Sequence, residues 1–445
     1  MNKGHEIARG KTKVLYEYPG QPDVVVVEQM DNISAGDGAR KDVIDGKGRI
    51  AAKTTARVFR LLNLCGLPTH YLSGGEDDDD NEMLVRRAQM IPLEVVVRGV
   101  AAGSLVKRKP GIQRGSLLVP RMIEFFFKDD ANHDPLIEVE AIVTGGYASP
   151  QEVATMSELA RITYEILAHA WRRRDTLLVD LKIEFGRIAS GDGKGTLVIA
   201  DVIDNDSWRV WPQGREDLML DKQAYRNLPT VTPQDLATIK ASYEQVADIV
   251  GTFPQMRPGM IAIVADGPQH TDLVNAIARG IGNFGLPSVR HIVSVERTPG
   301  YALQLVSQLD ATFARMVVIA VGSPGSALPG MLDNATANPV MRAISGELDL
   351  DALGFACAKA LGLEDTVVFG RVLLMQANVR SAVMQADAQI NTQAQPQGTF
   401  ACCSRCWASA RPWPKTARAS MQRQVSPMRS LRRPTRGRQR STSAP

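Results

Sequence analysis

The sequence of 445 residues is poor in cysteine and in aromatic side chains, and it contains no long apolar run. Five cysteines in a chain of this length do not form a disulfide framework, and only Cys65 and Cys357 lie in sequence that reads as folded, which fits a reducing compartment. No apolar run approaches the roughly 18–20 residues that span a membrane. The first residues lack the apolar segment of a secretory signal. We therefore predict a cytoplasmic protein without a membrane partner.

The net charge of +4 hides an uneven distribution. Residues 401–445 hold ten arginines, one lysine and no acidic residue, so they carry +11 and leave −7 for the rest of the chain. A basic tail can bind nucleic acid or an anionic membrane. Trp407 and Trp413 are its only large aromatic residues, too few for a base-stacking surface. We interpret residues 391–445 as a disordered basic tail and do not expect nucleic-acid binding.

Residues 1–250 mix strand and helix patterns. Short β-branched runs predict strands, residues 41–65 have helical spacing, and two Pro-containing capping boxes predict helix starts. The expected strands are 14–18, 24–29, 177–185 and 196–203, and the capped helices start at Ser149 and Thr232. Residues 251–258 contain two prolines and read as a linker.

From residue 259 to 390 the pattern changes to alternating strands and helices. Met260–Ala265 and Met316–Val321 are apolar strand candidates, and Asp272–Phe284 is a helix candidate between them. Such alternation favours a parallel sheet covered by helices. The sequence therefore predicts a second, α/β domain.

Two glycine-containing loops near the start are candidate phosphate sites. Gly10-Lys-Thr-Lys13 resembles the end of a P-loop, but His5 stands where that motif needs glycine, and a strand follows. A glycine with flanking lysines can still cover nucleotide phosphates, and an ordinary turn is the alternative. The loop 31–38, with Ser34 and Asp37, brings small residues that allow close approach to a phosphate, or it is a plain connection.

The strongest chemical pattern lies between residues 180 and 186. Alternate residues of a strand share a face, so Asp180, Lys182 and Glu184 point the same way. Charges on an otherwise apolar strand need partners or a metal. Glu184 and Asp201, at neighbouring strand ends, are the hard oxygen ligands that Mg²⁺ prefers, and a structural ion-pair network is the alternative.

Six short motifs in order resemble those of the SAICAR synthetase family. They cover residues 8–250 and comprise Gly10–Lys13, Ser34–Gly38, Glu94–Ser104, Phe127–Pro135, Leu178–Gly186 and Asp221–Arg226. The resemblance implies a two-lobed α+β fold related to ATP-grasp and kinase-like architectures. It also implies an enzyme that joins carboxyaminoimidazole ribotide (CAIR) to L-aspartate, with ATP as substrate and Mg²⁺, through an acyl phosphate. The sequence of residues 201–211 is closer to that of the animal-type bifunctional enzymes than to that of stand-alone bacterial ones.

The resemblance also implies a role for each matching residue. Lys182 and Asp180 are catalytic, Gly10, Lys11, Lys13 and Glu184 bind ATP, and Glu184 and Asp201 hold the metal. Substrate-binding residues are Arg98, Ser104, Arg209, Arg226, Ser34 and Asp37. The alternative hypothesis is a non-catalytic nucleotide-binding scaffold. The convergent charges of Asp180, Lys182, Glu184 and Asp201 argue against it.

Residues 259–345 more loosely resemble an AIR carboxylase (PurE-type) domain, which implies a flavodoxin-like three-layer fold and a homo-oligomer. The matching pieces include Gly282–Pro287, Val293–Pro299 and Leu328–Met331. Glu296 stands where the family has a catalytic histidine, and an imidazole exchanges protons near neutral pH as a carboxylate does not. We expect an inactive or altered domain, and a fully bifunctional enzyme is the alternative.

Overall fold

The computed structural model describes residues 1–36, 39–77, 79–253, 259–346 and 349–393. By internal contacts, Met1–Val383 form one compact unit. The predicted boundaries at residues 250, 259 and 390 stay predictions. Asp37 and the tail from residue 394 lie outside the described residues, and so does most of the predicted linker.

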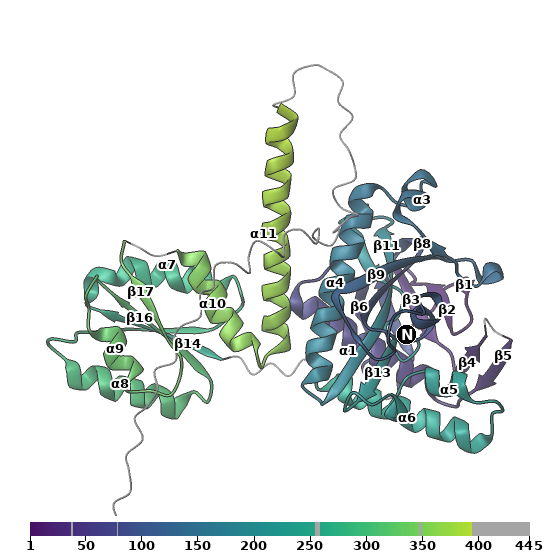
Figure 1. Cartoon of the computed structure of the whole chain (residues 1–445), viewed down its shortest axis with the longest axis horizontal. Coiled ribbons are helices and arrows are strands. Elements are labelled where there is room, and N and C mark those ends of the chain that lie inside the picture. Colours follow the sequence, from purple (N-terminus) through teal and green to yellow (C-terminus); the bar gives the residue numbers. More distant parts are fainter. Residues whose placement is uncertain (37–38, 78, 254–258, 347–348, 394–445) are drawn as a thin grey trace, which may run out of the picture. The chain divides into compact units, whose positions relative to one another are not determined.

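The N-terminal part contains an antiparallel sheet of five strands in the order β1-β2-β3-β7-β6 (Figure 1). The strands are β1 (Glu6–Arg9), β2 (Lys13–Glu17), β3 (Val24–Gln29), β6 (Tyr71–Ser73) and β7 (Glu82–Arg86). Helix α1 (Lys47–Cys65) packs against this sheet with Val58, Leu61 and Leu62 buried. The strands predicted over residues 14–18 and 24–29 are confirmed as β2 and β3.

The predicted helix over residues 41–65 begins later than expected. A hairpin of β4 (Asn32–Ala35) and β5 (Arg40–Val43) occupies its first residues. Gly46 then adopts a left-handed conformation with φ of 79°, and α1 starts at Lys47. Helical spacing alone cannot detect this boundary, because the polar residues of the hairpin show no alternation that would indicate a strand.

A second antiparallel sheet follows the path β10-β9-β8-β11-β12, with β13 also paired to β11. Its strands are β8 (Ala88–Val100), β9 (Leu117–Phe127), β10 (Leu136–Ile137), β11 (Thr176–Ile188), β12 (Leu197–Ala200) and β13 (Trp208–Pro212). Helix α4 (Pro150–Arg172) packs on β11 and β8. One apolar core, with Phe59, Leu62, Trp171 and Phe185, joins residues of both sheets, α1 and α4. This arrangement agrees with the predicted α+β class.

Both predicted capping boxes are present. Ser149 Oγ accepts the Glu152 N–H while the Glu152 carboxylate accepts the Ser149 N–H, and α4 follows. Thr232 and Asp235 do the same at α6 (Pro233–Gly251). The remaining helices here are α2 (Ser104–Arg108), η1 (Asp130–Asn132), α3 (Val139–Thr144), η2 (Glu216–Leu218) and α5 (Gln223–Asn227).

Residues 259–362 contain a four-stranded parallel sheet in the order β15-β14-β16-β17 (Figure 1). The strands are β14 (Met260–Asp266), β15 (Ser288–Val293), β16 (Met316–Gly322) and β17 (Val340–Ile344). The helices are η3 (Pro268–His270), α7 (Thr271–Gly282), α8 (Pro299–Thr312), α9 (Leu328–Asp333) and α10 (Leu350–Gly362). One core lies between the sheet and α7 with α10, the other between the sheet and α8 with α9. The predicted three-layer α/β arrangement is confirmed.

Helix α11 (Thr366–Gln393) is long and apolar. Its segment Thr366–Asp387 is long and apolar enough, by length and composition, to cross a membrane, which we did not expect. A single such helix is weak support, because a core helix of a soluble protein passes the same test. Val367, Val368 and Val372 in its first turns are buried in the protein. The cytoplasmic location stays a prediction.

Candidate active site

Strand β11 places the three predicted charges on one face of the second sheet. Its partner β8 is antiparallel, with Asp180 opposite Arg98 and Glu184 opposite Glu94. On the other side, Glu184 lies opposite Ala200 of β12, so Asp201 follows directly at that strand's end. Asp180 and Glu184 are 6% and 4% exposed, so water does little to stabilise their charges.

Lysines neutralise the Glu184 carboxylate. Lys182 Nζ lies 2.6 Å from Glu94 Oε1 and 3.3 Å from Glu184 Oε1, and Lys128 Nζ lies 2.6 Å from Glu184 Oε2. Burial opposes ionisation of Glu184, but Lys182, Lys128 and Lys13 outweigh it and lower its pKa to about 2. Burial likewise opposes the charged form of Lys182, yet Glu184 and Glu94 raise its pKa. Both groups are therefore ionised at neutral pH.

Lys13 joins the nucleotide-loop candidate to this cluster. Its ammonium pairs with the Asp201 carboxylate, and Asp201 has a left-handed φ of 65°. Burial lowers the pKa of Lys13 to about 8, although Glu184 opposes the shift. Lys13 thus pairs with Asp201 and acts electrostatically on Glu184, which connects the predicted nucleotide loop with the two predicted metal ligands.

A second cluster is built around Arg98, which is 4% exposed. Arg98 donates through Nε to Glu124 at 2.5 Å and through a terminal nitrogen to Asp180 at 3.1 Å. Arg209 also donates to Asp180. Ser104 Oγ accepts from Arg98 at 3.4 Å and from Arg108 at 2.9 Å. The structure therefore brings together Arg98, Ser104, Arg209 and Asp180, four of the predicted residues.

The other predicted residues are more scattered. Gly10 lies in the turn between β1 and β2, where its N–H donates to the Lys13 carbonyl at 2.9 Å. Lys11 is exposed in the same turn, and Ser34 is half-buried in β4 opposite Lys41. Arg226 is exposed in α5 and acts electrostatically on Asp206. Asp37 is outside the described residues.

Sequence reasoning missed the partners of the predicted residues. Glu94 and Lys128 complete the Glu184 cluster, and Glu124 and Arg108 complete the Arg98 cluster. Glu124 accepts from Arg98 and from Arg108, both at 2.5 Å, and although burial opposes ionisation, Arg108 and Arg98 lower its pKa. Glu124 of β9 lies opposite Val96, between the charged positions Glu94 and Arg98 of β8, a register that the sequence does not reveal.

A metal ion bound by Glu184 and Asp201 fits the donors present. Within the described residues no group of three or more His, Cys, Asp or Glu side chains is arranged to hold an ion by itself. Mg²⁺ usually takes one or two protein carboxylates and completes its shell with water and substrate phosphates. Two carboxylates that meet at Lys13 suit an ion that arrives with a nucleotide.

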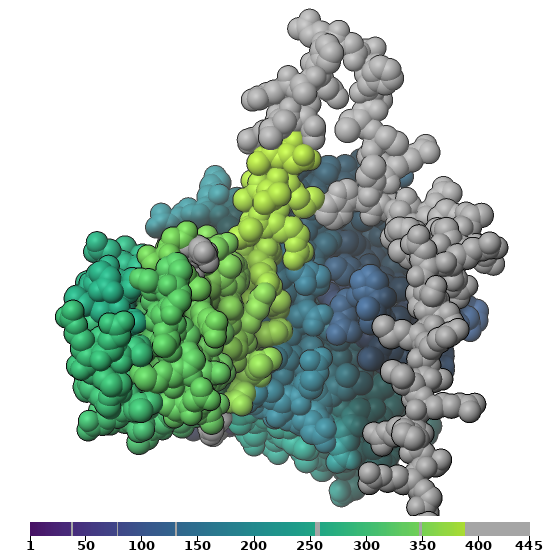
Figure 2. Space-filling model, turned by 60° about the vertical axis from the view of Figure 1, so that its left-hand side comes forward, coloured from purple at the N-terminus to yellow at the C-terminus, as the bar shows by residue number. Residues whose placement is uncertain are grey.

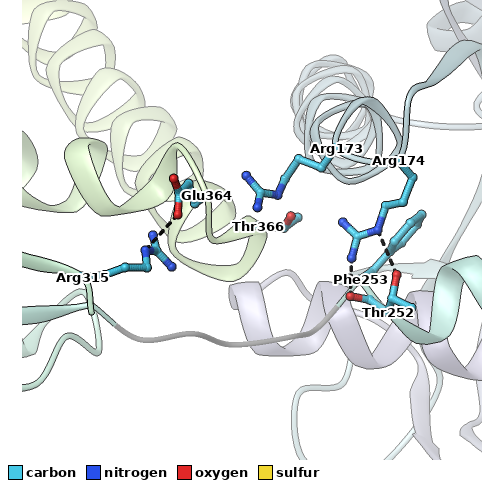
Figure 3. A pocket seen from close by; sticks show the side chains of 7 residues that line it. All are labelled: Arg173, Arg174, Thr252, Phe253, Arg315, Glu364 and Thr366. Carbon is cyan, nitrogen blue, oxygen red and sulfur yellow. Dashed lines mark hydrogen bonds and ion pairs between the residues drawn. The ribbon is translucent and has the colours of Figure 1, made fainter. Parts of the chain in front are cut away.

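Figure 3 shows a pocket in which arginines are already engaged. Arg174 Nε donates to Thr252 Oγ1 at 2.8 Å, and Arg315 Nε pairs with Glu364 at 3.0 Å. None of the predicted site residues lies among its labelled residues. These arginines therefore give no reason to place the reaction there.

Gly103 lies against the Arg209 guanidinium. We expect Gly103→Ala to weaken substrate binding. Its φ is 57°, and a Cβ there would lie 2.4 Å from an Arg209 terminal nitrogen. The methyl group must push this arginine away from Asp180, while the backbone is strained. Steady-state assays should show a raised KM for the substrate that Arg209 contacts. Gly111→Ala is the matched control, because nothing lies within 4 Å of a Cβ there. Equal KM values for both variants would contradict this role.

The α+β fold with lysines, arginines and carboxylates on one sheet face defines an enzyme that handles several anionic groups together. A family model described as SAICAR synthetase matches residues 6–243. A phosphoribosylaminoimidazole-succinocarboxamide synthase of Herpetosiphon aurantiacus is 49% identical over 253 residues, 57% of this chain and 100% of that protein. The chain belongs to the SAICAR synthetase family. It is a ligase of purine biosynthesis, and the predicted family is confirmed for the N-terminal part.

Two further similarities set the extent of the match. The crystal structure of a phosphoribosylaminoimidazole-succinocarboxamide synthase from Ehrlichia chaffeensis is 28% identical, covers 56% of this chain and 100% of its own, and has a TM-score of 0.50. A probable multifunctional protein ADE2 of Caenorhabditis elegans is 33% identical over 414 residues, 86% of this chain and 96% of that protein. That second match extends well beyond residue 250, so the C-terminal part also has a counterpart in a relative.

Proposed function

We propose that the N-terminal part condenses CAIR with L-aspartate to give SAICAR, ADP and phosphate, through an acyl phosphate formed with ATP. One observation carries this proposal: Lys13, Lys182 and Lys128 converge on Glu184 of β11, and the Arg98 cluster is bound to Asp180 of the same strand. The reaction gathers three anionic substrates: ATP with its triphosphate, CAIR with a carboxylate and a phosphate, and aspartate with two carboxylates. Preorganised cations stabilise the charge that develops as a phosphoryl group moves between them.

Each group has a distinct part in the proposed reaction. Lys11 and Lys13, with the Gly10 turn, hold the ATP phosphates, and Lys182 stabilises the reacting carboxylate. Asp180 keeps Arg98 and Arg209 in place by accepting from both. The remaining substrate contacts are assigned to Ser104, Arg226, Ser34 and Asp37. Glu184 and Asp201 would hold Mg²⁺, which supplies charge neutralisation of the nucleotide phosphates when it is bound.

The direct test is ADP release by the purified full chain with CAIR, ATP, Mg²⁺ and aspartate. We expect release that requires CAIR and aspartate together, because the acyl phosphate forms only on CAIR and is consumed only by the amine. Omission of each substrate in turn is the control. A folded protein that binds ATP but releases no ADP would instead support the non-catalytic scaffold.

The pKa of Lys13 predicts a pH dependence of ATP binding. With a pKa of about 8, Lys13 is charged below that pH and becomes neutral above it. The KM for ATP should therefore rise as the pH increases through about 8 to 9. Lys13→Arg keeps its charge throughout this range, so its KM should stay flat. Parallel pH–KM profiles are the measurement, and an equal rise in both proteins would assign the titration to another group.

For the C-terminal part we infer a PurE-like domain that does not carboxylate AIR. Glu296 is exposed and stands where the family's histidine is expected. Asp266, at the end of β14, is occupied internally: its carboxylate accepts from the Val295 N–H at 3.1 Å and from Ser326 Oγ at 2.7 Å. His270 is buried with Ser323 Oγ at 3.4 Å from Nε2. CAIR formation from AIR and bicarbonate tests this, and turnover would establish the bifunctional alternative.

We also infer that the chain forms a homo-oligomer. Val379 and Val383 of α11 are 55% and 64% exposed, and Figure 2 shows the outer surface of this helix in yellow-green. Contiguous exposed apolar residues favour association because contact removes them from water. Light scattering coupled to gel filtration measures the mass directly, and a monomer of 48.4 kDa would refute the inference.

A further inference from the structure

Lys47 is a buried cation at an unusual place. It is the first residue of the 19-residue helix α1, and its side chain is among the largest fully buried ones, with 1% of the residue exposed. A positive charge at a helix N-terminus opposes the helix dipole, and a buried charge loses its hydration. The first turn of α1 contains no acidic residue to offset it. This position is therefore unfavourable for stability alone.

The ammonium of Lys47 has little to satisfy it. It lies 5.7 Å from the centroid of the Tyr243 ring, and it attracts Asp204 and Asp206 electrostatically. Asp206 is already engaged by Lys222 Nζ at 2.8 Å and by the Tyr243 hydroxyl at 3.3 Å. Across the described part of the chain, no hydrogen bond or ion pair is found for the Lys47 ammonium. A buried cation without an acceptor indicates that something else supplies one.

The charge balance around Lys47 favours an anion. Lys47, Lys222 and Arg226 face Asp204 and Asp206. Burial raises the pKa of Asp204, and the neighbouring Asp206 adds to the shift. Burial opposes ionisation of Asp206 too, but Lys47 and Lys222 lower its pKa to about 2. The group therefore carries at least one net positive charge before any ligand binds.

This cluster adjoins the proposed reaction centre. The Ser207 carbonyl, one residue after Asp206, accepts the backbone N–H of Lys182 at 2.7 Å. Asp204 acts electrostatically on Lys13. The start of α1 is also held closely: the Gly48 N–H donates to Asp31 at 2.8 Å, and a Cβ at Gly48 would lie 2.5 Å from the Gln29 carbonyl oxygen. Lys47 is thus fixed beside Gln29, the register partner of Lys13 in the pairing of β2 with β3, and it acts electrostatically on Asp204 and Asp206, just before Ser207.

We propose that Lys47 receives a carboxylate of the amino-acid substrate. This rests on the proposed function, in which an amino acid with two carboxylates must present its amine to the acyl phosphate. The phosphates and the ribotide already have cations of their own in Lys13, Lys182 and Arg98. Lys47, with Arg226 and Lys222 beside it, supplies the additional positive charge that a dianionic amino acid requires, within reach of the same centre.

The test compares Lys47→Gln with Lys53→Gln in the full chain. Lys53 lies on the same helix and pairs with Asp248 at 3.4 Å near the surface. We expect K47Q to raise the KM for aspartate by a factor of about 10 to 100, the loss of one charge-assisted hydrogen bond, with the KM values for CAIR and ATP unchanged. K53Q should leave all three unchanged. An unaltered KM for aspartate in K47Q, or an equal rise for all three substrates, overturns the proposal.

A second readout does not depend on turnover. L-Aspartate should raise the melting temperature of wild type and of K53Q but not of K47Q, since ligand bound to the native state stabilises it. Lys47→Arg keeps the charge and should recover part of this shift. If wild type releases no ADP yet shows the aspartate shift and K47Q does not, the proposed function fails and the subsite stands. Equal shifts in wild type and K47Q refute the subsite whatever the activity.

Discussion

Replacing Lys182 with methionine is expected to lower kcat for CAIR-dependent ADP release by about 10²- to 10³-fold, the usual loss when one preorganised charge is removed. The Lys182 ammonium lies between Glu94 and Glu184, which keep it charged by raising its pKa. Methionine fills similar space and supplies no charge. The KM for ATP should change little, because Lys13 and the Gly10 turn remain. Steady-state kinetics with each substrate varied in turn measure both quantities.

Lys182→Arg is the matched control for this experiment. Arginine keeps the charge but spreads it over a planar group, so it should recover only part of the rate. Thermal melting separates loss of chemistry from loss of structure, since Glu184 still has Lys128 at 2.6 Å in the methionine variant. A methionine variant that melts normally and keeps the wild-type kcat would show that Lys182 pairs carboxylates for stability alone.

Much of this site was predictable because strand alternation is a strong constraint. Asp180, Lys182 and Glu184 share a face by the period of two, and the pairing of β11 with β8 and β12 then brings Arg98 and Asp201 beside them. The capping boxes at Ser149 and Thr232 fixed two helix starts for similar reasons, since their signals are local. Local pattern and chain order were sufficient for these features.

The partners of these residues were not predictable, because they depend on register between distant strands. Nothing local marks Glu124 as the acceptor for both Arg98 and Arg108, or Glu94 as the partner of Lys182. Lys47 lies within the predicted helix of residues 41–65, and nothing in the local sequence distinguishes it from an ordinary surface lysine. Its burial arises only when α6 brings Tyr243 over it, far along the chain.

In the C-terminal part the strands were predictable and the loops were not. Short apolar runs such as Met316–Val321, alternating with helix patterns, favour buried strands of a covered parallel sheet. The loop after β14, by contrast, is shaped by hydrogen bonds to other loops: Asp266 takes the Val295 N–H and the Ser326 hydroxyl. The sequence alone gives no sign that this carboxylate is used internally, because its partners lie about 30 and 60 residues further along the chain.

Replacing Arg98 with methionine is expected to destabilise the protein by about 3 kcal/mol, because breaking a buried ion pair leaves a charge without its partner. Arg98 is 4% exposed and links Glu124 at 2.5 Å with Asp180 at 3.1 Å. Arg108 and Arg209 still contact these carboxylates, which keeps the loss near the lower end of the usual range. Urea denaturation of the full chain at neutral pH measures the change in free energy of unfolding.

A double substitution tests whether the loss comes from the stranded charge. Asp180→Asn removes one of the two carboxylates that Arg98 neutralises, so Arg98→Met combined with Asp180→Asn should be more stable than the sum of the single losses predicts. Arg215, which pairs with Asp217 at the surface, is the matched control, and Arg215→Met should lie close to wild type. Additive losses in the double variant would mean that Arg98 stabilises the sheet through packing of its stem. Arg98 and Asp180 both belong to the proposed substrate site. Non-additivity in stability would therefore imply that the substrate-binding free energy cannot be divided between them. Activity losses in the single variants would then be effects on one connected cluster.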